Sequence, residues 1–194
     1  MSSCFCCFKC GNSFFGPGHV QLKELPVVKL DTSHMGNDVV IVKNGRRICG
    51  TGAAFANAPV VQNKAYFEIK VQSTGIWGVG LATQKSDLNV VPLGNDPDSW
   101  VLRNTGELVT NKQTVSKLTE IPQEGDIVGL SFDHIDLKFY VNGQVADQTF
   151  TGIKGTLFPV FYVDDGAVLD VQFEKFYHTP PEGFDSIMIE QSLL

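Results

Sequence analysis

Short apolar runs that end at turn signals recur along most of this chain, between residues 20 and 173. The segment 66–72 (YFEIKVQ) alternates strictly, so its apolar and polar members fall on opposite faces of a predicted strand. The segment 76–82 (IWGVGLA) is apolar throughout, which is typical of a strand covered on both sides. Between residues 20 and 175 no sustained helical stripe occurs. The pattern therefore predicts an all-β fold.

Turn signals place the other predicted strands. Asn44-Gly45 and Asn142-Gly143 are strong hairpin signals, because both positions tolerate a positive φ. The remaining predicted strands are 27–30, 39–43, 46–49, 127–132, 137–141, 144–150, 157–163 and 168–173. Strands at this spacing indicate a sandwich or a barrel. Residues 84–125 are the least regular stretch and predict long loops, where binding residues are usually found.

The glycines of the apolar strand invite a second interpretation. Gly75, Gly78 and Gly80 could suggest a phosphate-binding loop, but such a loop needs a helix N-terminus directly after it. Here the glycines lie inside a predicted strand and no helical pattern follows. They are expected to mark a bulge or a close backbone approach. Trp77, between them, is expected to pack in the core.

Length and charge limit the organisation and the partners. The 194 residues fit a single domain, although two small domains have the same length. We predict a Cys-rich tail over 1–18, a β domain over 19–184 and a C-terminal tail over 185–194. The formal net charge of −6 argues against a nucleic-acid partner. The basic cluster of Lys43, Arg46 and Arg47 is too small to change that expectation.

Cysteines gather at the start of the chain. Cys4, Cys6, Cys7 and Cys10 lie within the first ten residues, whereas Cys49 is expected to be a buried thiol. The cluster has three interpretations: S-acylation at a membrane surface, a zinc site of which Cys7 and Cys10 would form half, or a tail without a role. We predict no metal site and keep the four cysteines as candidate lipidation residues. The absence of a disulfide framework predicts a cytoplasmic protein, peripherally bound to membrane if acylated.

Six segments in order resemble the SPRY domain family. They are 66–69 (YFEI), 75–83 (GIWGVGLAT), 124–133 (EGDIVGLSFD), 137–143 (LKFYVNG), 157–163 (LFPVFYV) and 166–173 (GAVLDVQF). The flanking stretches 22–25, 38–52 and 177–184 are similar to a small single-domain member of this family. The resemblance implies a bent antiparallel β-sandwich of two sheets. It also implies that surface loops recognise a protein or peptide.

The family's pocket is altered in this chain. One well-known peptide pocket of SPRY domains carries Trp-Gly just after the strand that contains Phe-Pro-Val. Asp164-Asp165-Gly166 occupies that place here, so another member's ligand should not be transferred. Asp164 and Asp165, with Arg46 and Arg47, could form a polar recognition rim, or they could be solvated loops or a salt bridge.

Two further residues are candidates for partner binding. Trp100 and Arg103 lie in the irregular stretch and are of the types that dominate interface centres. The alternative for Trp100 is packing beneath a loop as a satellite core residue.

No catalytic pattern accompanies these residues. His19, His34, His134 and His178 are scattered, and none belongs to a recognised catalytic motif. We therefore predict no catalytic residues and no cofactor. The leading hypothesis is a non-catalytic, monomeric module that binds a protein or peptide partner through loops of the sandwich. The alternatives are a lipid-tethered scaffold at a membrane surface and an enzyme on this fold.

Overall fold

The computed structural model describes residues 26–189. Within this range the regular secondary structure consists of β-strands alone. The strands are β1 (Leu30–Met35), β2 (Asp38–Val42), β3 (Arg47–Ala56), β4 (Ala65–Ser73), β5 (Ile76–Ala82), β6 (Ser99–Arg103), β7 (Glu107–Thr110), β8 (Gln113–Lys117), β9 (Ile127–Phe132), β10 (Asp136–Val141), β11 (Gln144–Thr151), β12 (Phe158–Asp164), β13 (Val168–Gln172) and β14 (Asp185–Ser186). The predicted all-β class is confirmed.

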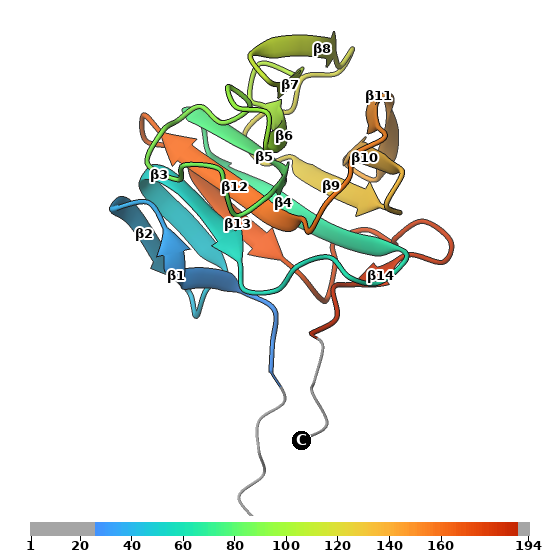
Figure 1. Cartoon of the computed structure of the whole chain (residues 1–194), viewed down its shortest axis with the longest axis horizontal. Helices are drawn as coiled ribbons and strands as arrows, with labels where there is room; N and C mark the ends of the chain where they lie inside the picture. The colour runs from blue at the N-terminus through green and yellow to red at the C-terminus, as the bar shows by residue number, and fades with distance from the viewer. Residues whose placement is uncertain (1–25, 190–194) are drawn as a thin grey trace, which may run out of the picture.

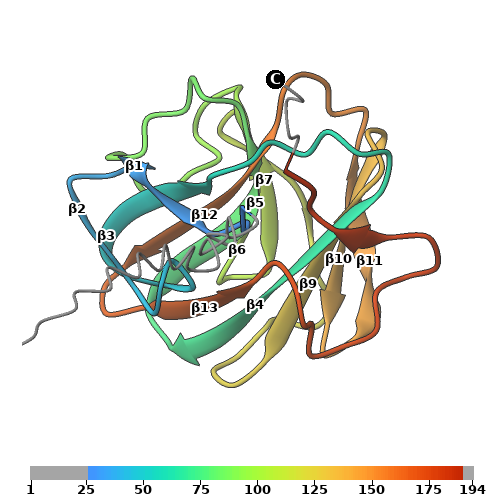
Figure 2. The ribbon, with the colours of Figure 1, turned by 90° about the horizontal axis from the view of Figure 1, so that it is seen from below.

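The strands form two antiparallel layers that share β3 (Figures 1 and 2). Sheet A has the order β1-β3-β12-β5-β6-β7-β8, and sheet B has the order β2-β3-β13-β4-β9-β10-β11. The first residues of β3 pair with β2 and β13, whereas its last residues pair with β1 and β12. One long strand thus passes from one sheet to the other. The predicted antiparallel β-sandwich is confirmed.

The main core lies between the sheets. Phe67 of β4 and Phe161 of β12 meet edge to face, with ring centroids 5.8 Å apart. Trp77, on β5, belongs to the same cluster and is only 2% exposed, as predicted. Aromatic rings packed in this geometry contribute beyond the area they bury. Large apolar side chains that point inward from the strands of both sheets therefore join the two sheets.

A second, smaller core covers the outer face of sheet A. Tyr162 and Val160 of β12 pack there with Val101 of β6 and with Leu93 from the loop between β5 and β6. This loop spans residues 83–98 and lies over the sheet, so β5 is covered on both faces. The continuous apolar run in β5 is thus explained by a folded-back loop rather than by a third sheet.

Glycines allow the close packing around β5. A Cβ on Gly80 would collide with the carbonyl oxygen of Trp100, and one on Gly78 would collide with the ring of Tyr162. Both residues face neighbouring strands in register, Gly80 opposite Val101 and Gly78 opposite Tyr162. The predicted close backbone approach is confirmed.

The C-terminal segment is built into sheet B. After β13 the chain runs over the second face of β4, and β14 then pairs in parallel with Ala65 and Tyr66. Ile187, which follows β14, is 4% exposed and belongs to the main core. The sequence pattern alone predicts a tail from residue 185 onward. The first residues of that predicted tail have a defined place on the sandwich, and residues 190–194 lie outside the described range.

Several predicted boundaries differ from the structure. The strand predicted at 27–30 begins only at Leu30, and the strand predicted at 46–49 continues to Ala56. The irregular stretch 84–125 contains β6, β7 and β8. Cys49 is half-buried rather than buried, because alternation along β3 directs the neighbouring Ile48 to the core instead.

Candidate partner-binding groove

An open groove of about 680 Å³ lies at one end of sheet A, where β5 ends and β6 and β12 begin. Its walls come from the beginning and end of loop 83–98 and from the loop between β11 and β12. The lining residues are Thr83, Gln84, Lys85, Pro97, Asp98, Trp100, Lys154, Gly155, Thr156 and Phe158. We call this hollow the Trp100 groove. It combines aromatic side chains with polar and charged ones, as peptide-binding surfaces commonly do.

Hydrogen bonds hold the loop ends that form one wall. The Thr83 hydroxyl donates to Asp98 Oδ1 at 2.9 Å, and the backbone N–H of Asp98 donates to Asp96 Oδ1 at 2.8 Å. Asp96 Oδ1 also accepts from the Ser86 hydroxyl at 3.1 Å. These bonds tie the first residues of the loop to the last. The wall is thus preorganised, which reduces the entropy lost when a ligand binds.

Trp100 lines the groove while packing against the core. Its side chain is half-buried and contacts the main hydrophobic cluster, and its backbone pairs with Leu81 of β5. Both interpretations from the sequence therefore describe part of its position. A tryptophan anchored on one side and open on the other offers rigid apolar area to a ligand. Its role in binding stays a prediction.

Arg103 braces the loop and is not among the groove's lining residues. Its Nε and Nη2 donate to the carbonyl oxygen of Leu93 at 3.2 and 2.7 Å, and Nη2 also donates to Asn95 Oδ1 at 3.0 Å. Burial raises the pKa of the neighbouring Tyr162, and the charge of Arg103 counteracts part of that rise. Arg103 thus acts on the groove through the loop that it positions.

Arg46 and Arg47 pair with acidic residues other than Asp164 and Asp165. Arg47 holds Asp170 of β13 through two hydrogen bonds, from Nε and from Nη2, the latter at 2.8 Å. Lys43 Nζ also lies 3.2 Å from Asp170, and Arg46 Nη2 lies 2.7 Å from Glu174. The two arginines therefore connect the β2–β3 hairpin to β13 and to the residues just after it.

Asp170, Arg47 and Lys43 form a group that we call the Asp170 cluster. Their pairing shifts the pKa of Asp170 and of Arg47. Burial alone would raise the pKa of Asp170, but the hydrogen bonds from Arg47 and Lys43 outweigh it, so the pKa lies below its usual range. The same pairing raises the pKa of Arg47. Two-point contact between a guanidinium and a carboxylate is the strongest common ion-pair geometry. The cluster joins the β2–β3 hairpin to β13, and the role of Arg47 in partner binding stays a prediction.

Asp164 ends β12, and Asp165 follows in the turn to β13. Asp164 Oδ1 accepts a hydrogen bond from the Thr51 hydroxyl at 3.0 Å. Asp165 is exposed and has a φ of 49°, in the left-handed region that Asp tolerates in turns. Neither residue lines the Trp100 groove. The candidate partner-binding residues are therefore spread over separate places, and only Trp100 reaches the groove.

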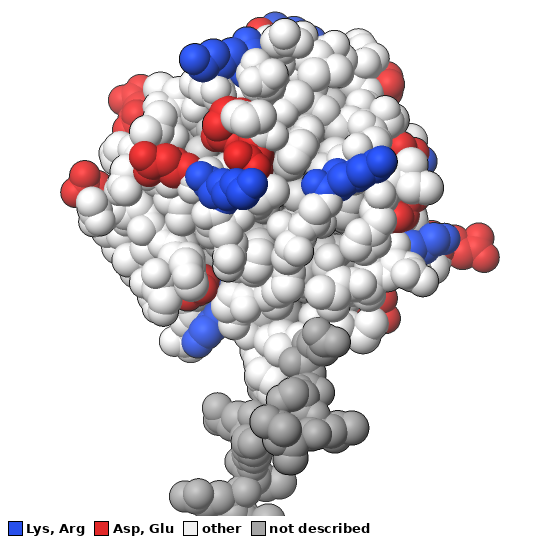
Figure 3. All heavy atoms as spheres, in the orientation of Figure 1, with Lys and Arg blue, Asp and Glu red and all other residues white. Residues whose placement is uncertain are grey.

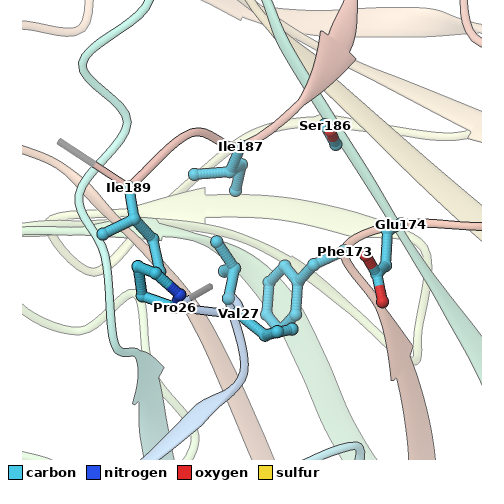
Figure 4. A pocket seen from close by; sticks show the side chains of 8 residues that line it. Pro26, Val27, Phe173, Glu174, Ser186, Ile187 and Ile189 are labelled. Atoms are coloured by element: carbon cyan, nitrogen blue, oxygen red, sulfur yellow. The ribbon is translucent and has the colours of Figure 1, made fainter. Parts of the chain in front are cut away.

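A smaller apolar cavity of about 250 Å³ lies where the first and last described residues meet (Figure 4). Pro26, Val27, Phe173, Ile187 and Ile189 supply most of its wall. Its polar members, Glu174 and Ser186, lie to one side. Since Glu174 is already paired with Arg46, few polar groups remain to fix the orientation of a ligand. The Trp100 groove is the better candidate.

Residues 26–189 contain neither a metal-binding cluster nor a membrane-spanning helix. In this range no three His, Cys, Asp or Glu side chains come together in a way that could hold a metal ion. The same range has no helix of the length and hydropathy needed to cross a bilayer. The candidate lipidation residues Cys4, Cys6, Cys7 and Cys10 lie outside it. On the face shown in Figure 3, the described basic and acidic side chains are interspersed without a continuous basic area.

Comparison with known sequences identifies the family. The sequence model of the SPRY domain matches residues 64–176. The chain belongs to the SPRY domain family. It is 56% identical over 194 residues to SPRY domain-containing protein 7 of Bos taurus and of Homo sapiens, with 99% of this chain and 98% of each relative covered. The SPRY domain-containing SOCS box protein 3 of Xenopus tropicalis is 32% identical over 127 residues, which are 58% of this chain and 34% of that protein.

Solved structures show the same SPRY fold at low sequence identity. The PSpry domain of TRIM65 superimposes with a TM-score of 0.63 at 14% identity and covers 76% of this chain and 90% of its own. Stonustoxin gives the same TM-score and identity, with 74% of this chain and 26% of the toxin chain covered. SPRY domains are generally protein-interaction modules. The resemblance seen in the six ordered segments is thus confirmed as family membership.

Proposed function

We propose that this chain is a non-catalytic protein-interaction module that holds a segment of a protein partner in the Trp100 groove. The observation that carries the proposal is the position of Trp100, half-buried against the core and open to a groove between braced loops. Membership of a family of interaction modules supports it. Binding energy in such interfaces is concentrated in a few aromatic or arginine anchors, and Trp100 is placed to be one.

The proposal is tested by recovering partners from cells. Full-length chain is used as bait, and bound proteins are identified by mass spectrometry for the parent, for Trp100→Ala and for Thr156→Trp. The second variant fills the groove from an exposed position and leaves the core intact. Ile135→Ala is the matched control, because Ile135 is 65% exposed and lies outside the groove. Circular dichroism and thermal unfolding establish that each variant is folded.

We expect both groove variants to lose the same partners by about tenfold or more and the control to retain them. Loss in Trp100→Ala alone would instead report damage to the fold, since Trp100 also packs on the core. Retention of every partner by Thr156→Trp would reject the groove as the binding site.

A further inference from the structure

Two lysines line the Trp100 groove from different loops. Lys85 belongs to the start of loop 83–98, and Lys154 belongs to the loop between β11 and β12. Both side chains are exposed. Neither takes part in a salt bridge among residues 26–189, whereas Lys43, Arg46, Arg47 and Lys138 do. The groove therefore holds two ammonium groups that have no salt-bridge partner in the described range, beside one carboxylate, Asp98.

Two carboxylates of loop 83–98, those of Asp96 and Asp98, already accept hydrogen bonds from the loop itself. Asp98 lines the groove, yet its Oδ1 accepts the Thr83 hydroxyl. Asp96 Oδ1 accepts from the Ser86 hydroxyl and from the Asp98 backbone. Carboxylates that already hold local donors offer weaker competition for a nearby ammonium group. A ligand entering the groove therefore meets two lysines and one carboxylate, Asp98, which already accepts a hydroxyl.

Apolar surface accompanies this charge. Trp100 and Phe158 both line the groove and are half-buried. The Phe158 ring is fixed against Phe55, with centroids 5.7 Å apart. Rings held in place by the core lose little entropy on binding, so they suit an apolar anchor from the ligand.

The geometry points to an acidic partner segment that carries at least one large apolar side chain, and this inference rests on the proposed function. Its carboxylates would pair with Lys85 and Lys154, while the apolar side chain would pack on Trp100 and Phe158. The net charge of −6 on the whole chain disfavours an acidic segment over much of the surface, so two lysines beside apolar rings favour its binding at this place. A nucleic acid would need a longer basic stripe than two lysines provide.

The test is a peptide selection against the folded full-length chain. A display library of random dodecamers is panned on the parent, and recovered peptides are synthesised and measured by fluorescence anisotropy. Each is then measured against Lys85→Glu/Lys154→Glu, and against Lys112→Glu/Lys117→Glu as the matched control. The control lysines are exposed, lie outside the groove on the β7–β8 hairpin, and change the net charge equally.

We expect the recovered peptides to be acidic with an aromatic or large aliphatic residue. The groove double variant should bind them at least about tenfold more weakly, and the control double variant within about twofold. Recovered peptides that are neutral or basic, an empty selection, or equal loss in both double variants would overturn the inference. So would a concentration-dependent dimer of the parent that Lys85→Glu/Lys154→Glu abolishes, since the occupant would then be a second copy.

The inference and the proposed function fail in different ways. If cellular partners are lost with Thr156→Trp but bind Lys85→Glu/Lys154→Glu normally, the groove binds proteins and the acidic class is wrong. If Thr156→Trp retains all partners, the proposed function itself is wrong.

Discussion

The backbone N–H of Tyr177 donates to Oε2 of Glu68 at 2.6 Å, although 109 residues separate the two. Glu68 lies on β4 and is fully buried. Its Oε1 accepts from the Tyr66 hydroxyl at 2.9 Å and from the His178 backbone at 3.1 Å. A buried carboxylate is tolerated when its oxygens are satisfied in this way. Glu68 thus links the segment after β13 to sheet B through hydrogen bonds.

Replacing Glu68 should therefore release that segment. Glu68→Gln turns one acceptor into a donor that would face a backbone N–H or a hydroxyl, and we expect a loss of about 2 kcal/mol in unfolding free energy. Tyr66→Phe removes a single donor and should cost about 1 kcal/mol. Urea unfolding measures both. In Glu68→Gln the backbone amides of Tyr177 and His178 should exchange their hydrogens faster with solvent. Unchanged protection of these two amides would contradict the view that Glu68 holds this segment on sheet B.

The Asp170 cluster predicts how stability depends on pH. Because the pKa of Asp170 is lowered on folding, its contribution is fully present above the ordinary carboxyl pKa. The contribution is lost as the pH falls through the lowered folded value, so the effect lies below about pH 4. Asp31, whose pKa is lowered by His34 and Ser33 against the opposing effect of burial, acts in the same direction.

Asp170→Asn should cost about 2 kcal/mol at neutral pH, because Arg47 would lose its charged partner at a largely buried position. The midpoint of urea unfolding, measured from pH 7 to pH 2, should fall less steeply in the variant than in the parent below pH 4. Parallel curves for the two proteins would show that Asp170 does not carry this dependence. Asp164→Asn is the matched control, since Asp164 accepts from a hydroxyl rather than from an arginine.

Local pattern was enough to predict strands that form short, mostly apolar runs. β5, predicted over 76–82, and β9, predicted over 127–132, have those bounds in the structure. β8 was missed because it lies at the edge of sheet A and its side chains are mostly exposed, so no apolar pattern marks it. Edge strands depend on backbone pairing with a neighbour, which a single-sequence pattern does not reveal.

The groove was only partly predictable, because it is made by tertiary structure. Trp100 was a candidate from its residue type and its place in an irregular stretch. Lys85 and Lys154 gave no local signal, since exposed lysines are common and their meeting depends on how β5 and β12 pair. The guanidinium of Arg103 donates to Leu93 and Asn95, and contact of Arg103 with a partner stays a prediction. A sequence shows that a residue is charged, but it does not show which polar group that residue will contact in the folded protein.

The cysteine cluster supports a prediction that is independent of the groove. Cys4, Cys6, Cys7 and Cys10 are clustered beside Phe5 and Phe8, a composition that suits S-acylation. If they are acylated, the parent should occur partly in the membrane fraction of cells. Replacing all four with serine should move it to the soluble fraction, because stable anchoring needs more than one chain. Cys49→Ser is the control, and an unchanged distribution of the fourfold variant would reject the tether.

Gly80 offers the sharpest test of the packing that positions Trp100. A Cβ at this position would overlap the carbonyl oxygen of Trp100 and lie 2.8 Å from the Cα of Val101. Both obstacles are backbone atoms of β6, so no side-chain rotation can relieve them. We expect Gly80→Ala to cost about 3 kcal/mol in unfolding free energy, near the upper end for overpacking.

The matched control for Gly80 is Gly125→Ala. Gly125 has a φ of 90°, but a methyl group added there would meet no neighbouring atom within 4 Å, so only backbone strain of about 1 kcal/mol is expected. Since β6 must move away from β5 to admit the methyl group, Gly80→Ala should also weaken partner recovery where Gly125→Ala does not. Equal costs for the two variants, measured by urea unfolding, would show that β5 and β6 have room to separate, and that Trp100 is held by something other than their close approach.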